Sequence, residues 1–373
     1  MPSGTEAGTQ YNAGVPATGA PGRPAGSGQP ARLAPLEAIR PLPVPPVLGS
    51  ADLGRLLAAH PFTALDVGAR GGFSRDLLPL APAVDARGFE PDADECRRLD
   101  EAAASAPGPW RSLRFLPAAL AAAAGSRTLH LTHQPGASSL LPPLPGRADR
   151  FARGSAFAVE RTAPVETLSL DEAAHRFALR EVRHLKIDVE GLELEVFEGA
   201  RSVLDELVAI RTEVAFQPLR QGQPLFADVE AFLRARGFQL ICFPEVHSWR
   251  RATRAKHPAL AVGPVPWSRG QLVHADAFFL REPEDLDVSS DAGARRAVQA
   301  AFLALVYGHV DHARAYLGLP AVERFVRDGC GLDRPAVERG LATASMALYR
   351  RSLQSEGRAL LRAGRRAWAS LVR

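Results

Sequence analysis

Residues 182–191 read VRHLKIDVEG, and this stretch decides the fold. Residues 182–187 predict a short buried strand that stops at the carboxylate of Asp188. A second carboxylate follows at Glu190, and Gly191 opens the next helix. Ligands of an open parallel sheet bind just beyond the carboxyl ends of its strands, so we expect Asp188 and Glu190 to face a pocket. The alternative is a surface turn in which Asp188 only caps the following helix.

An upstream strand, FTALDV, also ends beside a carboxylate, Asp66. The turn that follows it, GARGG, holds Gly68, Gly71 and Gly72, which let the backbone approach a ligand without a side chain in the way. A helix expected at residues 74–80 then offers free N–H groups to an anionic group. The spacing is not GxGxxG, so the dinucleotide fingerprint is not met.

Glu90 follows a third predicted strand, residues 84–89. A carboxylate at the end of the neighbouring strand can bind the two ribose hydroxyls of a nucleoside. The alternative is a solvated residue at a helix start, ahead of Pro91. We expect Asp66, Glu90 and Asp188 to converge on one nucleoside-shaped crevice.

The predicted strands and helices alternate with short connections. This pattern favours an α/β fold with a doubly wound, mostly parallel sheet covered on both faces. Residues 238–243 and 277–280 are two further strands with no helical pattern between them, so we expect them to pair antiparallel. The remaining strands are expected at residues 62–67, 113–116, 128–132, 156–165 and 207–214, and helices at 51–59, 92–105, from 169, 192–197 and around 226–233.

Composition divides the chain into three parts. Residues 1–49 are rich in Gly, Pro, Ala, Ser and Thr with little periodicity, so we expect a disordered arm. Residues 50–285 hold the alternating strands and helices. Residues 286–373 have a helical pattern throughout and form a helical C-terminal extension.

Several classes of protein are excluded by composition. No apolar run approaches about 18 residues, so no membrane span is predicted, and no secretory signal is visible. The three cysteines lie far apart without a metal-ligand pattern, which indicates reduced thiols in a cytoplasmic protein.

The excess of basic over acidic residues lies in the C-terminal part of the chain. The formal net charge is +4, yet from Asp291 onward Arg outnumbers acidic residues two to one, so the body is mildly acidic. Nothing in the body indicates a nucleic-acid surface. The last predicted helix, residues 335–372, is either a surface helix in peripheral contact with anionic lipid, glycan or a partner, or a solvated cap on the sheet, which we favour.

Residues 134–153 interrupt the alternation of strands and helices. The stretch QPGASSLLPPLPGR has too many prolines for a regular element and predicts a loop over the pocket mouth. His133 ends a strand just before this loop.

The segments DVGARGGFS, GFEP, SSLL, TLSLDE, HLKIDVEGLELEVFEGA and AIRTEV occur in this order. Together they resemble the FkbM-type S-adenosylmethionine-dependent methyltransferases over residues 62–243. The resemblance implies a class I methyltransferase fold, with a seven-stranded sheet whose last strand is antiparallel, and S-adenosyl-L-methionine as cofactor.

Individual residues match the family pattern. Asp66, Gly68 and Gly72 fall on the cofactor-binding loop, which gives Gly71 the same expected role, and Glu90 matches the ribose-binding acid. Arg70 and Gly71 stand where an Asn and an apolar residue are commoner. The acid pair after the fourth strand is Asp188 and Glu190, with Asp188 also expected near the cofactor, and the paired serines of the loop are Ser138 and Ser139.

Methyl transfer to an alcohol needs alignment of the activated methyl with the attacking oxygen, and it invites a general base. Asp188 and Glu190 are the nearest candidates, and His133 is a third. Asp188 with Glu213 is an alternative pair for a divalent cation. Two carboxylates without further ligands favour a metal-free polar pocket, which is our prediction.

The resemblance therefore implies a methyltransferase, and it alone implies the acceptor class: a hydroxyl oxygen of a small molecule, sugar or lipid-linked glycan. The loop around Ser138 and Ser139 is the expected acceptor gate. Two alternatives stay open: an NAD-binding oxidoreductase, and a non-catalytic binding or assembly protein of the same fold.

Overall fold

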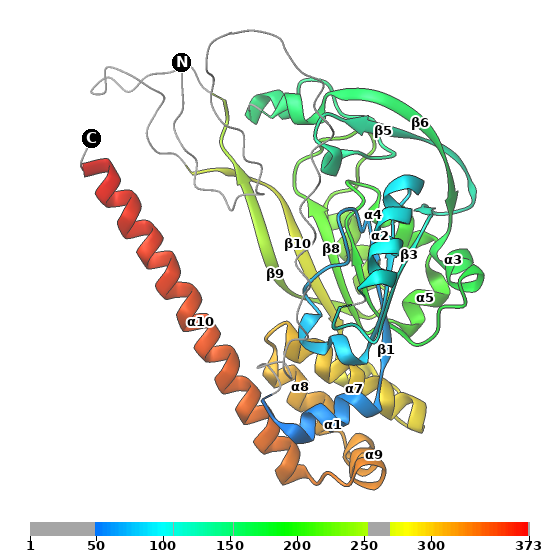
Figure 1. The fold of residues 1–373 in the computed structure, drawn as a ribbon, viewed down its shortest axis with the longest axis vertical. Coiled ribbons are helices and arrows are strands. Elements are labelled where there is room, and N and C mark those ends of the chain that lie inside the picture. The colour runs from blue at the N-terminus through cyan, green and yellow to red at the C-terminus, as the bar shows by residue number, and fades with distance from the viewer. Residues whose placement is uncertain (1–48, 107, 152, 253–268, 372–373) are drawn as a thin grey trace.

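A computed structural model describes residues 49–106, 108–151, 153–252 and 269–371. Its centre is a seven-stranded sheet in the order β3-β2-β1-β7-β8-β10-β9 (Figure 1). The predicted arm, apart from residue 49, lies outside the described residues. The strands of this sheet are β1 (Phe62–Val67), β2 (Val84–Phe89), β3 (Ser112–Leu116), β7 (Val182–Ile187), β8 (Ala209–Ala215), β9 (Phe238–Trp249) and β10 (Gln271–Arg281).

The predicted sheet topology is confirmed. β1 pairs in parallel with β2 and β7, and β7 pairs in parallel with β8. β10 pairs antiparallel with both β8 and β9. Because β10 runs against its neighbour, its first residues lie at the edge where β7 and β8 end.

Both faces of the sheet are covered, because alternate side chains of a strand point to opposite faces. Phe62 and Ala64 of β1 belong to one apolar cluster, and Leu65 and Val67 belong to another. The second cluster is completed by residues of α3 (Leu170–Arg176), α4 (Glu193–Glu198), α5 (Arg201–Glu206) and α6 (Phe226–Arg234), and α2 (Ala93–Ser105) packs near β3.

The expected helix at residues 74–80 is wrong. The chain instead forms turns and a 3-10 helix, η1 (Leu78–Ala83), before β2. Pro79 and Pro82 explain the difference, because proline lacks the N–H that an α-helix interior requires. The turn after β1 therefore does not lead directly into an α-helix.

Helices from the C-terminal extension cover the other face of the sheet. Phe302 and neighbouring residues of α7 (Asp291–Val306) share one apolar cluster with Phe62, Ala86 and Phe278 of the sheet. The cluster also takes side chains from α1 (Ala51–Ala59), α8 (Val310–Leu317), α9 (Pro320–Cys330) and the first part of α10 (Arg334–Leu371). The rest of α10 extends away from these helices (Figure 1).

Two predicted strands lie outside the main sheet. β5 (Gly125–Thr132) and β6 (Val159–Leu168) pair antiparallel, and β4 (Ala119–Leu120) joins β6 in a separate three-stranded sheet. β6 reads VERTAPVETL and is largely exposed, so it lacks the apolar content of a strand buried on both faces. Among the described residues, no helix is both long and apolar enough to span a bilayer.

Candidate functional site

A cavity of about 950 Å³ opens at the carboxyl edge of the parallel strands. Asp66, Glu90, Asp188 and Glu190, which follow or end three neighbouring strands, all line it. Further predicted residues on its wall are Gly68, Gly72, Ser138 and Ser139. Among the described residues, this lining leaves out Gly71 and His133.

Gly68 lets two loops approach each other at the base of the cavity. Its φ of 86° lies in the left-handed region, and a Cβ atom there would lie 2.0 Å from the backbone oxygen of Asp188. At Gly72 (φ 126°) a Cβ would meet nothing within 4 Å. Gly68 therefore permits the packing of the β1 and β7 loops, and Gly72 borders open space.

Asp66 anchors the site from beneath. It is buried, and its Oδ2 accepts the backbone N–H of Ser74 at 2.7 Å. Its Oδ1 lies 3.2 Å from the Nζ of Lys186, which is 3.6 Å from Asp188 Oδ2. The family resemblance places Asp66 on the cofactor-binding loop; in the structure both its carboxylate oxygens contact protein groups.

Lys186 is the cation of this group. Burial opposes its charge, but Asp66 and Asp188 outweigh that effect and raise the pKa of Lys186 above its ordinary value. Burial also raises the pKa of Asp66, while Lys186 lowers it. Lys186 therefore pairs with two acids, one of them on the neighbouring strand.

Glu90 lines the neighbouring wall and is 2% exposed. Its Oε1 accepts the backbone N–H of Asp92 at 2.9 Å. A carboxylate has about four lone-pair sites on two oxygens, so Glu90 retains capacity for a ligand's hydroxyls. Burial raises its pKa, and the Asp92 hydrogen bond and the charge of Arg70 lower it.

Three carboxylates gather on the far side of the cavity. Ligand oxygens of Asp188, Glu190 and Glu213 all lie within 4.8 Å of one another. Burial raises the pKa of Glu190 well above its usual range; Arg220 opposes this, and Glu213 and Asp188 add to it. Burial raises the pKa of Glu213 as well, followed by the charge of Asp188.

Basic side chains partner two of these carboxylates. The guanidinium of Arg220 pairs with Glu190 Oε2 and donates to the backbone oxygen of Ala137 at 2.9 Å. His274, near the start of β10, places Nδ1 2.6 Å from Glu213 Oε1. The antiparallel direction of β10 brings His274 to this edge of the sheet.

Glu193 closes the loop that carries the acid pair. Its Oε1 accepts the backbone N–H groups of Val189 and Gly191 at 3.0 and 3.1 Å. Glu190 has a φ of 59° within this loop. Burial raises the pKa of Glu193 to about 7, against the two hydrogen bonds that lower it.

The serine loop contacts the acid loop directly. Ser139 Oγ donates to the backbone oxygen of Glu190 at 2.9 Å, and Ser138 Oγ accepts the backbone N–H of Thr132 at 3.2 Å. Figure 1 places the β5–β6 sheet beside this end of the main sheet.

His133 is not brought together with the other candidates. Its side chain is 68% exposed and its Nδ1 lies 2.7 Å from Glu160 Oε1. Leu129 and Leu131 line the cavity, so simple alternation would place His133 on the same side. The pairing register with β6 shifts between Leu131 and Thr132, which ends that alternation.

Sequence reasoning missed three residues of the site: Arg220, Glu193 and His274. Arg220 follows β8, forms an isolated β-bridge with Pro143 and has no recognisable motif around it. Glu213 was considered only as a metal ligand, although its place near the end of a predicted strand was a signal equal to that of Asp188.

Comparison with known proteins identifies the fold unit that holds this cavity. Residues 66–240 match the family profile described as Methyltransferase FkbM domain. The chain contains an FkbM methyltransferase domain. The matched residues include Asp66, Glu90, Asp188, Glu190 and Glu213, the acidic residues of the two cavity walls described above.

The chain also resembles solved structures in its fold. The solved structures similar to it include the crystal structure of 23S rRNA methyltransferase ErmE, at 12% sequence identity and a TM-score of 0.26, covering 79% of this chain and 96% of that chain. A search of curated proteins found no match.

Proposed function

We propose that this methyltransferase transfers the methyl group of S-adenosyl-L-methionine to a hydroxyl oxygen of a small molecule, sugar or lipid-linked glycan. The observation that carries the proposal is the two-sided cavity. One wall has a glycine turn and the buried Glu90, and the other has three carboxylates beside a serine loop.

The residues of the first wall suit the cofactor. Glu90 offers a carboxylate to the ribose hydroxyls, where hydrogen bonds to a charged acceptor are strong. The open space beside Gly72 leaves room for the methionine part. The ammonium group of Lys186, paired with Asp66, places a positive charge on the cavity lining between the two walls. When bound, the cofactor supplies an activated methyl group on a sulfonium.

The second wall supplies the proton acceptor. Asp188 adjoins Lys186, and its side chain is 31% exposed, against 23% for Glu190, which pairs with Arg220. In the proposed reaction an acceptor hydroxyl would give its proton to Asp188 while its oxygen bonds to the methyl carbon; the methyl–sulfur bond would break and its electron pair would return to sulfur, leaving a neutral thioether. Arg220 and Ser139 hold Glu190 and the serine loop in place around the acceptor.

Calorimetry with S-adenosylmethionine and, in parallel, with NAD tests the cofactor assignment. We expect binding of the former and none of the latter; the reverse would make the chain a dinucleotide-binding protein. A panel of hydroxylated acceptors with radiolabelled cofactor then tests transfer. Tight cofactor binding without turnover on a broad panel would favour a non-catalytic binding role.

A further inference from the structure

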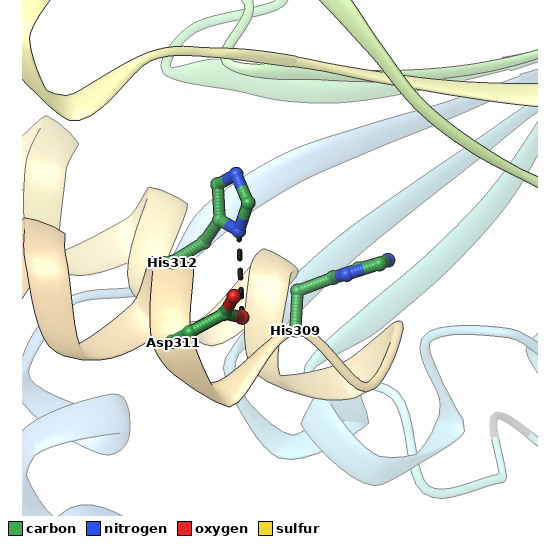
Figure 2. Close-up of side chains that lie close together, drawn as sticks. All are labelled: His309, Asp311 and His312. Carbon is green, nitrogen blue, oxygen red and sulfur yellow. Dashed lines mark hydrogen bonds and ion pairs between the residues drawn. The ribbon is translucent and has the colours of Figure 1, made fainter.

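A second group of metal-ligating side chains lies outside the cavity, at the start of α8. Figure 2 shows His309, Asp311 and His312 on one turn, with the ring of His312 over the carboxylate of Asp311. Each residue offers one ligand atom, and these atoms lie within 4.8 Å of one another. Two imidazoles and one carboxylate form a mixed nitrogen and oxygen donor set.

The spacing of two of these donors suits a metal better than a hydrogen bond. His312 Nδ1 lies 3.5 Å from Asp311 Oδ1, which is beyond the usual 2.7–3.2 Å of an N–H···O bond. Two ligands at about 2.0–2.1 Å from a tetrahedral zinc ion are roughly 3.4 Å apart. The pair therefore already has the separation that zinc requires.

Two further side chains lie near the outer ring nitrogens of these histidines. His312 Nε2 lies 3.9 Å from Glu282 Oε2, just after β10, and His309 Nε2 lies 3.5 Å from the Sγ of Cys242 in β9. Ligating histidines commonly direct their second ring nitrogen to such an acceptor, which orients the ring. His309 also stacks on Phe278 at 5.9 Å, with an interplanar angle of 12°.

Charge around the group is balanced for a cation. The helix N-terminus carries a partial positive charge that opposes a cation, and the carboxylates of Asp311 and Glu282 offset it. By contrast, the guanidinium of Arg220 already pairs with Glu190, one of the three carboxylates in the cavity.

We propose that His309, Asp311 and His312 bind one divalent transition-metal ion of the zinc type, with water completing its coordination. Imidazole donors favour zinc over magnesium or calcium, which prefer oxygen ligands. The site lies at the start of α8, beside Cys242 of β9 and Glu282 just after β10. It is separate from methyl transfer, because its ligands lie outside the residues that line the cavity.

Calorimetric titration of the full chain with Zn²⁺ and with Mg²⁺ tests the site. We expect one Zn²⁺ site of micromolar or tighter affinity and no Mg²⁺ binding there. His312→Gln and Asp311→Asn each weaken Zn²⁺ binding at least tenfold, whereas His175→Gln, at an exposed histidine of α3, leaves it unchanged. Equal Zn²⁺ affinity in wild type and His312→Gln, or no binding at all, would overturn the proposal.

The absorption spectrum of bound Co²⁺ distinguishes this site from an alternative site that contains a cysteine thiolate. A Co²⁺ complex of two imidazoles and a carboxylate has visible d–d bands without strong thiolate charge-transfer absorption in the near ultraviolet. We expect d–d bands that disappear in Asp311→Asn. Strong thiolate absorption, abolished by Cys330→Ser, would instead place the ion at Cys330 and His60, whose Sγ and Nε2 lie 3.8 Å apart, and would refute the assignment.

Discussion

Arg220 is the residue on which the acid side of the cavity depends. Its side chain is 2% exposed, and its guanidinium joins Glu190 to the backbone of Ala137 and lies 5.1 Å from the ring centre of Phe157. Removing one partner of a buried ion pair leaves an uncompensated charge, which costs far more than the pair itself contributes.

Arg220→Met is therefore expected to lower the free energy of unfolding by about 3–5 kcal/mol. The double variant Arg220→Met, Glu190→Gln should recover much of this loss, because no unpaired charge remains. Urea unfolding measures both. Arg314→Met is the control: its pair with Glu338 is exposed, so the change should stay within about 1 kcal/mol. Equal effects of the two single variants would contradict the prediction.

Glu90→Ala should weaken binding of S-adenosylmethionine. The lost hydrogen bonds to a charged acceptor are worth about 1.5–3 kcal/mol, or roughly 10–150-fold in affinity. Calorimetry measures the change, and Glu101→Ala, at an exposed position of α2, serves as control. An unchanged affinity in Glu90→Ala would show that the ribose is bound elsewhere.

Asp188→Asn is expected to reduce turnover by about 10²–10⁴-fold, because the amide cannot accept the acceptor's proton. Cofactor affinity should be nearly preserved. Initial rates with a responsive acceptor and calorimetry separate the two quantities. His133→Gln should leave both unchanged, since His133 lies outside the cavity lining. Parallel losses of rate and affinity in Asp188→Asn would reassign Asp188 to cofactor binding.

At the residue scale, the sequence predicted the acids that follow strands but not the groups that pair with them. Asp66, Glu90, Asp188 and Glu190 could be located because parallel strands end at one edge. Arg220 could not, because its partners are distant in sequence and its neighbours form no motif.

At the scale of elements, β7 is joined to α7 by a buried polar contact. His184 Nε2 lies 3.0 Å from the hydroxyl of Tyr307, the C-cap residue of α7, and the two rings stack. Burial lowers the pKa of His184 to about 4. The ring is therefore neutral in the folded protein across the neutral range.

This contact predicts a pH dependence of stability. As pH falls from 6.5 to about 4, His184 gains a proton in the unfolded chain but not in the folded one. Its contribution to stability is complete above pH 6.5 and falls by up to about 3 kcal/mol towards pH 4. The difference in unfolding free energy between wild type and His184→Gln, measured by urea unfolding at several pH values, should shrink by that amount.

Carboxyls with raised pKa values have the opposite effect, since they stabilise the fold as pH falls. They are present in both chains and cancel in the difference. A difference that stays constant between pH 7 and pH 4 would show that His184 titrates normally in the fold.

The strands of the main sheet were predictable as elements because their positions follow from composition and alternation. The helix expected after β1 was not formed, because Pro79 and Pro82 act against it. The assignment of β5 and β6 to a second sheet also escaped prediction, because strand propensity does not specify which neighbour a strand pairs with.

At the scale of the whole molecule, the C-terminal helices belong to the core of the sheet. Phe302 of α7 is 1% exposed and shares its apolar cluster with strands β1, β2, β8 and β10. The division expected from sequence at residue 286 marks a change in pattern, and the apolar cluster continues across it.

Phe302→Ala should therefore destabilise the entire protein by about 3–5 kcal/mol in one cooperative transition. Met346→Ala, at a 50% exposed position of α10, should change stability by no more than about 0.5 kcal/mol. Calorimetric unfolding checks both. Two separate transitions in wild type, with only one shifted by Phe302→Ala, would mean that the helices unfold independently.

The cover that α7 provides for the sheet has a consequence for biosynthesis. During translation, β1 and β2 are synthesised long before α7. The apolar face around Phe62 and Ala86 therefore stays exposed until α7 has been made. Exposed apolar surface of that kind aggregates or recruits chaperones. Truncated chains that end before α7 would keep this apolar face exposed, and we expect them to aggregate rather than fold.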